Sequence, residues 1–437
     1  MTTAGVLDMA AVTVQPAGPV SGAVRAPASK SVTNRLLVIA ALADGDSVLR
    51  APLDSDDSRA MAACLAALGA DVTIDGADWR VSGTGGALVT PGARLDARLS
   101  GTTARFVTAI ATLAADGAEV DGAPALRRRP IGPLVDALRT LGAKVDDHDG
   151  ALPVRVAGGG IAGGPVDIDV DRSSQFASAV LLAAPYAATD VECRLRGRSA
   201  TDYIALTVDL MVAAGARVER TDGGWRVHAG GTYRPRDVEV EYDASAAAHL
   251  HALAAATGGA VTVANAVPTR QPDGTAVDVF AAFGCAVDTG AAGVTIAGPD
   301  RLRPVDVSLA AMPDQVTTFA ALAALAPATS VLRDVGVARL HETDRLAALA
   351  AELGRLGIVV EAAADRLTIH GGTPRGPAVL RTYDDHRLAM AFTALAAHVP
   401  GVTIADPGCV AKTYPAFWHD LSMLGCRWHA AGAGDGT

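Results

Sequence analysis

The sequence predicts an α/β (α+β) protein built from six βαβαββ repeats, which divide into two domains of three repeats each. Two periodic features support this prediction. One is a series of Ala- and Leu-rich helices that begin at small or polar residues, and the other is a series of glycines that each end an amphipathic helix. The two features recur independently at nearly the same interval, which is the signature of a repeat protein.

The first helix start is the segment 28–35 (ASKSVTNR), which runs directly into the apolar stretch 36–43. A helix that is apolar on all sides is buried, so only its start is available for chemistry. Unpaired N–H groups and the positive end of the dipole attract anions there, and Lys30 and Arg35 add full charges. Taken alone, these charges could equally be a solvated cap. Five similar starts follow, and the six marker residues are 71, 73, 71, 69 and 71 residues apart: Lys30, Gly101, Ser174, Ser245, Asp314 and Asp385.

The second feature is a glycine at the end of a helix, which is a common stop signal. A short strand follows each glycine, and in the first five repeats a turn and a second strand come next, as at 71–74 and 79–82. The six glycines are 73, 73, 69, 73 and 68 residues apart: Gly69, Gly142, Gly215, Gly284, Gly357 and Gly425.

Composition and charge exclude several classes of protein. The 437 residues carry a formal charge of −10, which argues against broad binding to nucleic acid. The sequence has no apolar run as long as a membrane span, and no cation precedes Arg25, so we expect neither a membrane protein nor a secretory signal. The five cysteines are odd in number and never spaced as CxxC, which favours a cytoplasmic protein without a metal cluster.

Charged segments at further helix starts carry the candidate chemistry. Three arginines precede Pro130, a residue type favoured at the first helical position; Arg129 is the best fixed of them, whereas Arg127 and Arg128 could be only solvated charges. Five ionisable groups fall within 339–345. Charges that head apolar helices are costly unless partnered, which favours a functional interpretation over surface ion pairs. The GGGIAG segment at 158–163 matches a dinucleotide motif, but a strand follows it, so no such site is predicted.

Six separated segments resemble the signature motifs of the 5-enolpyruvylshikimate-3-phosphate synthase family. They follow the family's order and spacing over nearly the whole chain: 29–35, 129–131, 173–175, 342–345, 385–387 and 412–415. The resemblance implies two domains, each an inverse α/β prism of three βαβαββ units, with buried helices whose N-termini point at the interdomain cleft. The chain would cross between the domains twice, so that domain I comprises 1–28 plus 243–437 and domain II comprises 29–242.

The resemblance also implies a reaction. The enolpyruvyl group of phosphoenolpyruvate passes to the 5-hydroxyl of shikimate 3-phosphate, and phosphate is released, as a step of aromatic amino acid biosynthesis. This addition–elimination needs a base for the hydroxyl, an acid for the methylene carbon, and cations for the phosphate and carboxylate groups. No cofactor or metal is implied. The expected partners are the two small-molecule substrates, and the expected state is a monomer.

Carried over position by position, the resemblance assigns roles to individual residues. Asp314 takes the hydroxyl proton and Glu342 handles the proton at the methylene carbon, with Lys30 and Lys412 as further catalytic contacts. Phosphoenolpyruvate is held by Lys30, Gly101, Arg129, Gln175, Arg345, Arg387 and Lys412. Shikimate 3-phosphate is held by Lys30, Ser31, Arg35, Ser173, Ser174, Gln175, Tyr203, Asp314 and His341.

Four positions depart from the family's usual residues, and they leave other acceptors open. Leu99 and Val337 stand where Asn is usual, His341 where Lys is usual, and Ala200 where Ser is usual, with Ser199 adjacent. The last three lie on the acceptor side. The alternatives are an enolpyruvyl transferase for another phosphorylated cyclitol, one for a nucleotide sugar, or a non-catalytic anion sensor. Nucleotide-sugar enzymes usually carry a reactive cysteine that segment 127–131 lacks, and a sensor would gain nothing from two buried carboxylates beside an anion.

Overall fold

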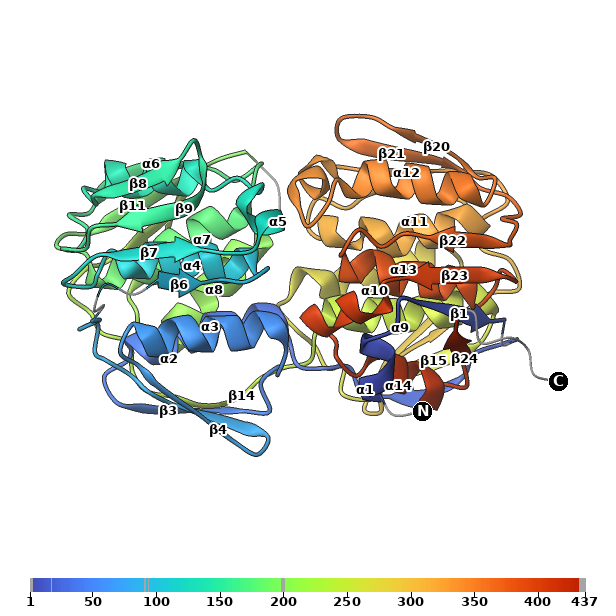
Figure 1. The fold of residues 1–437 in the computed structure, drawn as a ribbon, viewed down its shortest axis with the longest axis horizontal. Coiled ribbons are helices and arrows are strands. Elements are labelled where there is room, and N and C mark those ends of the chain that lie inside the picture. The colour runs from blue at the N-terminus through green and yellow to red at the C-terminus, as the bar shows by residue number, and fades with distance from the viewer. Residues whose placement is uncertain (1–2, 17, 90–91, 93, 198–200, 432–437) are drawn as a thin grey trace. The chain divides into compact units, whose positions relative to one another are not determined.

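The computed structural model describes residues 3–16, 18–89, 92, 94–197 and 201–431 (Figure 1). The chain divides into two compact units: unit 1 comprises Met1–Pro27 with Tyr242–Thr437, and unit 2 comprises Ala28–Glu241. Among the described residues, each unit contains three four-stranded sheets and its own hydrophobic core. The predicted α/β fold of six βαβαββ repeats is confirmed.

Unit 2 is one continuous segment of the chain. Its elements are α2 (Lys30–Leu42), β3 (Asp46–Arg50), α3 (Asp56–Ala67), β4 (Asp71–Asp75), β5 (Asp78–Ser82), β6 (Arg94–Asp96), α4 (Gly101–Ala111), β7 (Ala118–Asp121), α5 (Pro124–Arg127), α6 (Gly132–Thr140), β8 (Val145–His148), β9 (Ala151–Val156), β10 (Gly164–Asp169), α7 (Ser174–Ala183), the 3-10 helix η1 (Ala184–Tyr186), β11 (Val191–Arg196), α8 (Asp202–Ala213), β12 (Val218–Thr221), β13 (Gly224–Val227) and β14 (Asp237–Glu239).

Unit 1 contains the two ends of the chain. Its elements are α1 (Thr3–Leu7), β1 (Ala11–Gln15), β2 (Gly22–Val24), α9 (Ala244–Thr257), β15 (Ala260–Val263), η2 (Pro272–Thr275), α10 (Ala276–Ala282), β16 (Ala286–Gly290), β17 (Gly293–Ala297), β18 (Asp306–Ser308), η3 (Pro313–Gln315), α11 (Val316–Leu325), β19 (Thr329–Arg333), η4 (Gly336–Leu340), α12 (Arg345–Arg355), β20 (Val359–Ala362), β21 (Arg366–His370), β22 (Ala378–Leu380), α13 (His386–Ala396), β23 (Val402–Ala405), η5 (Pro407–Lys412), α14 (Phe417–Met423) and β24 (Arg427–Ala430).

The middle repeat of unit 2 shows the common pattern. Strands β6 and β7 pair in parallel, and the buried helix α4 connects them. Helix α6 then leads to the antiparallel hairpin of β8 and β9, and β9 pairs with β7. A parallel pair requires a crossover helix whereas a hairpin requires only a tight turn, so the repeat has the order βαβαββ.

Three strands come from distant parts of the chain. In unit 2, β14 completes the sheet of β3, β5 and β4, and in unit 1, β2 completes the sheet of β15, β17 and β16. Strand β1 (dark blue in Figure 1) lies between β23 and β24 (red), antiparallel to both. The N-terminal segment therefore supplies the second hairpin strand that the sixth repeat lacks in its own sequence.

Three apolar helices form the centre of each unit: α2, α4 and α7 in unit 2, and α9, α11 and α13 in unit 1. In α9 every residue from Ala244 to Ala256 is buried. Helices this apolar can only be buried. Their charged residues lie in the first two turns, whereas α9 also buries two histidines further along, His249 and His251.

The six glycines that the sequence predicts at helix ends all have the left-handed conformation. Their φ angles run from +81° at Gly357 to +99° at Gly69. A residue with a Cβ would be strained at such a φ, which explains why glycine recurs there. Within the described part of the chain, no helix is long and apolar enough to cross a membrane.

Candidate active site

Polar side chains stand at the starts of the six central helices. Five helices have a capping residue whose side chain accepts a backbone N–H two or three residues further on: Ser29, Ser100, Ser173, Asp243 and Asp385. The sixth helix, α11, follows η3, which places Asp314 at its start. Each cap satisfies one N–H group, and the positive end of the dipole favours an anion in front of the helix.

Lys30 at the start of α2 forms an ion pair with Asp57 in the first turn of α3. The Lys30 Nζ lies 3.2 Å from Asp57 Oδ2, and the two side chains are 15% and 3% exposed. The neighbouring helix therefore holds the ammonium group near the start of α2. Sequence reasoning missed Asp57, because a pairing between two helices leaves no local pattern.

Gly101 and Arg129 are packed together in unit 2. A Cβ placed on Gly101 would lie 2.7 Å from Nη1 of Arg129 and 3.0 Å from Cζ. The guanidinium group thus occupies the space beside the first turn of α4 that a side chain at residue 101 would fill. The structure brings together these two residues, which the sequence assigned to the same ligand.

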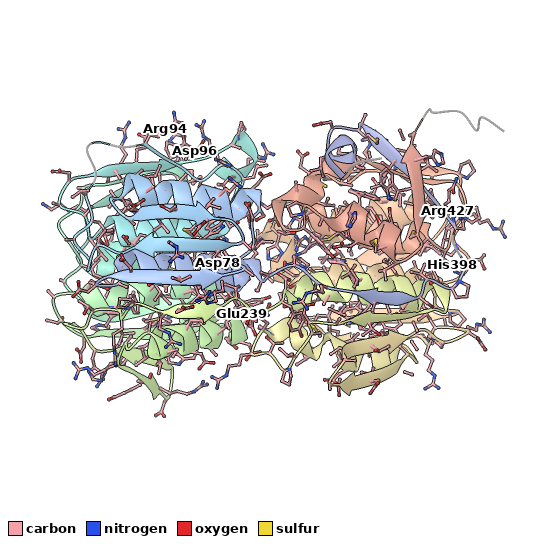
Figure 2. The ribbon with its side chains drawn as sticks, turned by 90° about the horizontal axis from the view of Figure 1, so that it is seen from below. Asp78, Arg94, Asp96, Glu239, His398 and Arg427 are labelled. Carbon is pink, nitrogen blue, oxygen red and sulfur yellow. The ribbon has the colours of Figure 1, made fainter. Side chains whose placement is uncertain are left out.

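The segment that carries Arg129 is anchored by the buried Asp121. Arg127 donates from Nε and Nη2 to the two carboxylate oxygens, at 2.8 and 2.5 Å, and the backbone N–H of Gly122 donates at 2.8 Å. Arg94 on β6, labelled in Figure 2, also donates to Asp121. Burial opposes ionisation of Asp121, but these donors lower its pKa to about 2. Arg127 is therefore an anchor of this segment and not only a solvated charge.

Gln175 is held by Arg105, a residue that sequence reasoning left without a role. The Nη1 group of Arg105 donates to Gln175 Oε1 at 2.6 Å, and Nη2 donates to the Pro130 carbonyl at 3.4 Å. The guanidinium lies over the Phe176 ring, 5.1 Å from its centroid. Because the Gln175 carbonyl is engaged, the amide NH₂ is the end of this side chain left to donate to a ligand.

Arg35 is buried, and its guanidinium N–H groups donate hydrogen bonds to other groups of the protein. It donates to Thr207 Oγ1 at 2.7 Å, to the Ser31 carbonyl at 2.9 Å, to the Tyr203 carbonyl at 3.3 Å and to Ser178 Oγ at 3.4 Å. Burial lowers the pKa of Arg35 to about 10, so the group is still a cation at neutral pH. In this structure Arg35 fixes the backbone of Ser31 and Tyr203, two further residues of the predicted set. Ser173 and Ser174 lie at the start of the neighbouring helix α7 and are buried.

Arg345 is the centre of the charge cluster in unit 1. Its side chain is 1% exposed and contacts three carboxylates. The Nη1 group donates to Asp314 Oδ1 at 2.5 Å and Nη2 donates to Glu342 Oε2 at 3.0 Å. Asp385 accepts from both Nε and Nη2, at 2.7 and 3.1 Å. The bidentate Asp385 contact fixes the plane of the guanidinium, which a single contact would not do.

Asp314 is ionised although it is partly buried. Burial alone would raise its pKa, but Arg387, His341 and Arg345 hold the pKa well below its usual range. Arg387 Nη2 lies 3.3 Å from Asp314 Oδ2, and His341 Nδ1 lies 3.1 Å from Oδ1. The pKa of a carboxylate between two guanidinium groups rises strongly when an anion binds those guanidinium groups in its place.

His341 is the neutral member of the cluster. Burial and the nearby Arg345 lower its pKa below the usual value, against the raising effect of Asp314. It is therefore uncharged at neutral pH and acts as a hydrogen-bonding group rather than a cation. Lys412 ends η5 and is mostly buried, and η5 packs against α13.

A buried polar network supports the turn that carries Asp314. The amide of the next residue, Gln315, donates to Asp273 Oδ1 at 2.7 Å, and Ser245 Oγ donates to the same oxygen at 2.6 Å. Thr318 Oγ1 donates to Gln315 Oε1 at 2.8 Å and lies 3.1 Å from His249 Nδ1. These bonds join the starts of α9 and α11. Sequence reasoning did not find them because the partners are up to 69 residues apart.

The described positions that depart from the family pattern differ in their exposure to solvent. Leu99 is 42% exposed and precedes α4, whereas Val337 is buried in η4, close in sequence to His341. Ala200 and Ser199 lie outside the described residues.

A pocket of about 720 Å³ lies at the other end of the central helices of unit 1. Its lining includes Thr257 at the end of α9, Leu325 at the end of α11, and His398 just after α13 (labelled in Figure 2). A helix of ten or more residues is about 15 Å long or more, so this pocket is well separated from the charge cluster.

Comparisons with known proteins agree with one another. The sequence model of one protein family, described as EPSP synthase (3-phosphoshikimate 1-carboxyvinyltransferase), matches residues 14–421. A 3-phosphoshikimate 1-carboxyvinyltransferase of Methanosphaerula palustris is 41% identical over 420 residues, which cover 94% of this chain and 99% of that protein. A chloroplastic one of Brassica napus is 40% identical over 441 residues, with 94% and 85% coverage.

Solved structures show the same fold. An EPSP synthase of Acinetobacter baumannii superimposes with a TM-score of 0.79 at 22% identity, over 96% of this chain and 99% of that one. The enolpyruvyl transferase NikO of Streptomyces tendae gives a TM-score of 0.78 at 20% identity, over 96% and 98%.

Proposed function

The chain belongs to the EPSP synthase family, and we propose that the two residue sets described above perform its reaction. It transfers the enolpyruvyl group of phosphoenolpyruvate to the 5-hydroxyl of shikimate 3-phosphate and releases phosphate. The roles of individual residues follow from their chemistry. The observation that carries the assignment is the position of Asp314 between Arg345, Arg387 and His341.

Asp314 accepts the proton of the acceptor hydroxyl. A carboxylate held by two guanidinium groups is a weak base, because its pKa is far below neutral. When the phosphate and carboxylate of phosphoenolpyruvate bind Arg345 and Arg387, these cations are shared between the substrate and the Asp314 carboxylate. The pKa of Asp314 therefore rises. The base thus gains strength when the donor substrate is bound.

Glu342 enters the reaction in its protonated form, donates this proton to the methylene carbon during addition and takes one back during elimination. Its Oε2 lies 3.0 Å from Arg345 Nη2, so the same guanidinium that meets the substrate orients the acid. The proton taken from the hydroxyl by Asp314 leaves with phosphate, and both carboxyl groups regain their starting state. Lys30 and Lys412 stabilise the charge that develops on the departing phosphate.

The residues of unit 2 hold the substrates. Arg129 beside Gly101, and the amide NH₂ of Gln175, are donors for phosphoenolpyruvate. Shikimate 3-phosphate is bound by hydroxyl groups and N–H groups at helix starts, contributed by Ser31, Ser173, Ser174 and Tyr203, and Arg35 acts by positioning this set. In unit 1, His341 supplies a neutral donor or acceptor.

Phosphate release from phosphoenolpyruvate by the purified protein tests this proposal. Release should require shikimate 3-phosphate, and nucleotide sugars should not replace it. Absence of release with both substrates, combined with thermal stabilisation by phosphoenolpyruvate, would refute shikimate 3-phosphate as the acceptor while retaining the donor site.

The enzyme is further proposed to work as a monomer in the cytoplasm. All five cysteines are free thiols, four of them buried, which suits a reducing compartment. Sedimentation at micromolar concentration should give the mass of a single chain, and a dimer mass would contradict the monomer.

A further inference from the structure

Helix α12 carries a second buried charge, Glu352, two turns after Arg345 and outside the charge cluster. Its side chain has no exposed surface. The Tyr383 hydroxyl donates to Oε1 at 2.7 Å, and the Arg381 backbone N–H donates to Oε2 at 3.1 Å. Arg355, which is 45% exposed, forms an ion pair with Glu352, and its Nε lies 2.9 Å from Oε2. A buried carboxylate is costly, and here two of its three partners belong to one segment before α13.

That segment contains two consecutive residues in the left-handed conformation. Tyr383 has φ +55° and Asp384 has φ +58°. Neither is glycine, and a residue with a Cβ, above all an aromatic one, rarely adopts this conformation unless its surroundings impose it. Backbone strain of this kind is concentrated at functional sites.

The strained turn leads directly into the charge cluster. Asp385 follows it, caps α13, and holds Arg345 by two hydrogen bonds. The Arg387 backbone N–H donates to Asp385 Oδ1 at 2.9 Å, and the Arg387 side chain reaches Asp314. A change in the turn would therefore move both guanidinium groups.

One helix holds the segment at both ends. Arg345 and Glu352 are seven residues apart on α12, which places them on the same face. Arg345 binds Asp385 after the turn. Glu352 binds Arg381 before the turn and Tyr383 within it. Together Arg345 and Glu352 fix the distance across the turn, so that Tyr383 and Asp384 are held in the left-handed conformation.

We propose that Glu352 is a positioning residue: through Tyr383 and Arg381 it holds the strained turn, and so places Arg345 and Arg387 for the enolpyruvyl donor. The inference rests on the proposed function of these two arginines. It predicts that loss of the Glu352–Tyr383 bond weakens donor binding more than acceptor binding. A carboxylate that served only the stability of the fold would affect both substrates alike, or neither.

The test compares Tyr383→Phe and Glu352→Gln with the matched control Arg355→Gln. Tyr383→Phe removes one donor from a side chain that is 39% exposed, so it leaves the core filled. Arg355→Gln removes the partner of Glu352 that does not belong to the turn. We expect the first two variants to raise the KM for phosphoenolpyruvate by about tenfold, the effect of one lost hydrogen bond to a charged group. The KM for shikimate 3-phosphate should stay within about twofold in all three, as should both constants in Arg355→Gln.

A second substitution tests the strain itself. Glycine adopts the left-handed conformation without steric cost, so adding Asp384→Gly to Glu352→Gln should recover part of the lost donor affinity. An unchanged KM for phosphoenolpyruvate in Tyr383→Phe, or equal changes for both substrates, would overturn the proposal. So would a double variant no better than Glu352→Gln. If instead the wild-type protein releases no phosphate, the proposed function fails and not the positioning role.

Discussion

Substitution of Gly101 by Ala is the most direct test of the donor site in unit 2. The added Cβ would lie 2.7 Å from Arg129 Nη1, 3.0 Å from Cζ and 3.2 Å from Nη2. Ordinary contact begins near 3.4 Å, so the guanidinium must retreat by at least 0.7 Å, the difference between 3.4 and 2.7 Å. Gly101 is the first residue of α4 and does not have a positive φ, so its backbone can carry alanine without strain. The variant should therefore be as stable as the wild type while Arg129 is displaced.

We expect the KM for phosphoenolpyruvate to rise between about tenfold and a hundredfold, because misplacement by about 1 Å costs this much at positioned groups. The assay is steady-state phosphate release at saturating shikimate 3-phosphate, whose own KM should change little. The matched control is Gly354→Ala, a helical glycine in α12 with open space around its Cβ position. An unchanged donor KM in Gly101→Ala would refute the reasoning, as would an equal increase in Gly354→Ala.

Three further predictions concern single ionisable groups. Asp314→Asn should retain thermal stabilisation by phosphoenolpyruvate but lose turnover by at least about a hundredfold, and turnover near wild type would refute the role of Asp314 as base. Asp121 has a folded pKa of about 2, below the unfolded value, so its ionised form stabilises the fold above about pH 4, and this contribution is lost as the pH falls toward 2. The difference in Tm between wild type and Asp121→Asn should therefore shrink over that range. A constant difference in Tm would contradict this prediction. His341 has a lowered pKa and is neutral above pH 6.5, so His341→Gln should leave the shape of the kcat profile unchanged between pH 6.5 and 8, whereas loss of an inflection there would show that His341 titrates.

The surface ion pairs are not expected to contribute comparably. Arg50 contacts Asp78 (labelled in Figure 2) and Asp237 across neighbouring strands, but its side chain is 51% exposed. Water and salt screen such pairs, so their removal should change the stability of the fold little.

Local features of the sequence were sufficient for the repeat fold. A glycine after a helix is required wherever the chain turns through a left-handed φ, and that requirement depends on neighbouring residues alone. The burial of a helix without a polar face is equally local, because such a helix has no side that water can solvate. For these reasons the six repeats, the central helices and the polar residues at their starts could be read from the sequence.

Only the tertiary structure decided how those residues are partnered. Strand β1 completes the sixth repeat from the opposite end of the chain, and nothing in its five residues specifies β23 and β24 as neighbours. In the same way, Asp385 and Glu352 meet partners 29 to 40 residues away, and Asp57 meets Lys30 from another helix. The sequence by itself determined which residue types stand at each helix start. The packing of helices against one another determined which charges touch, because that depends on distances between segments that no local pattern encodes.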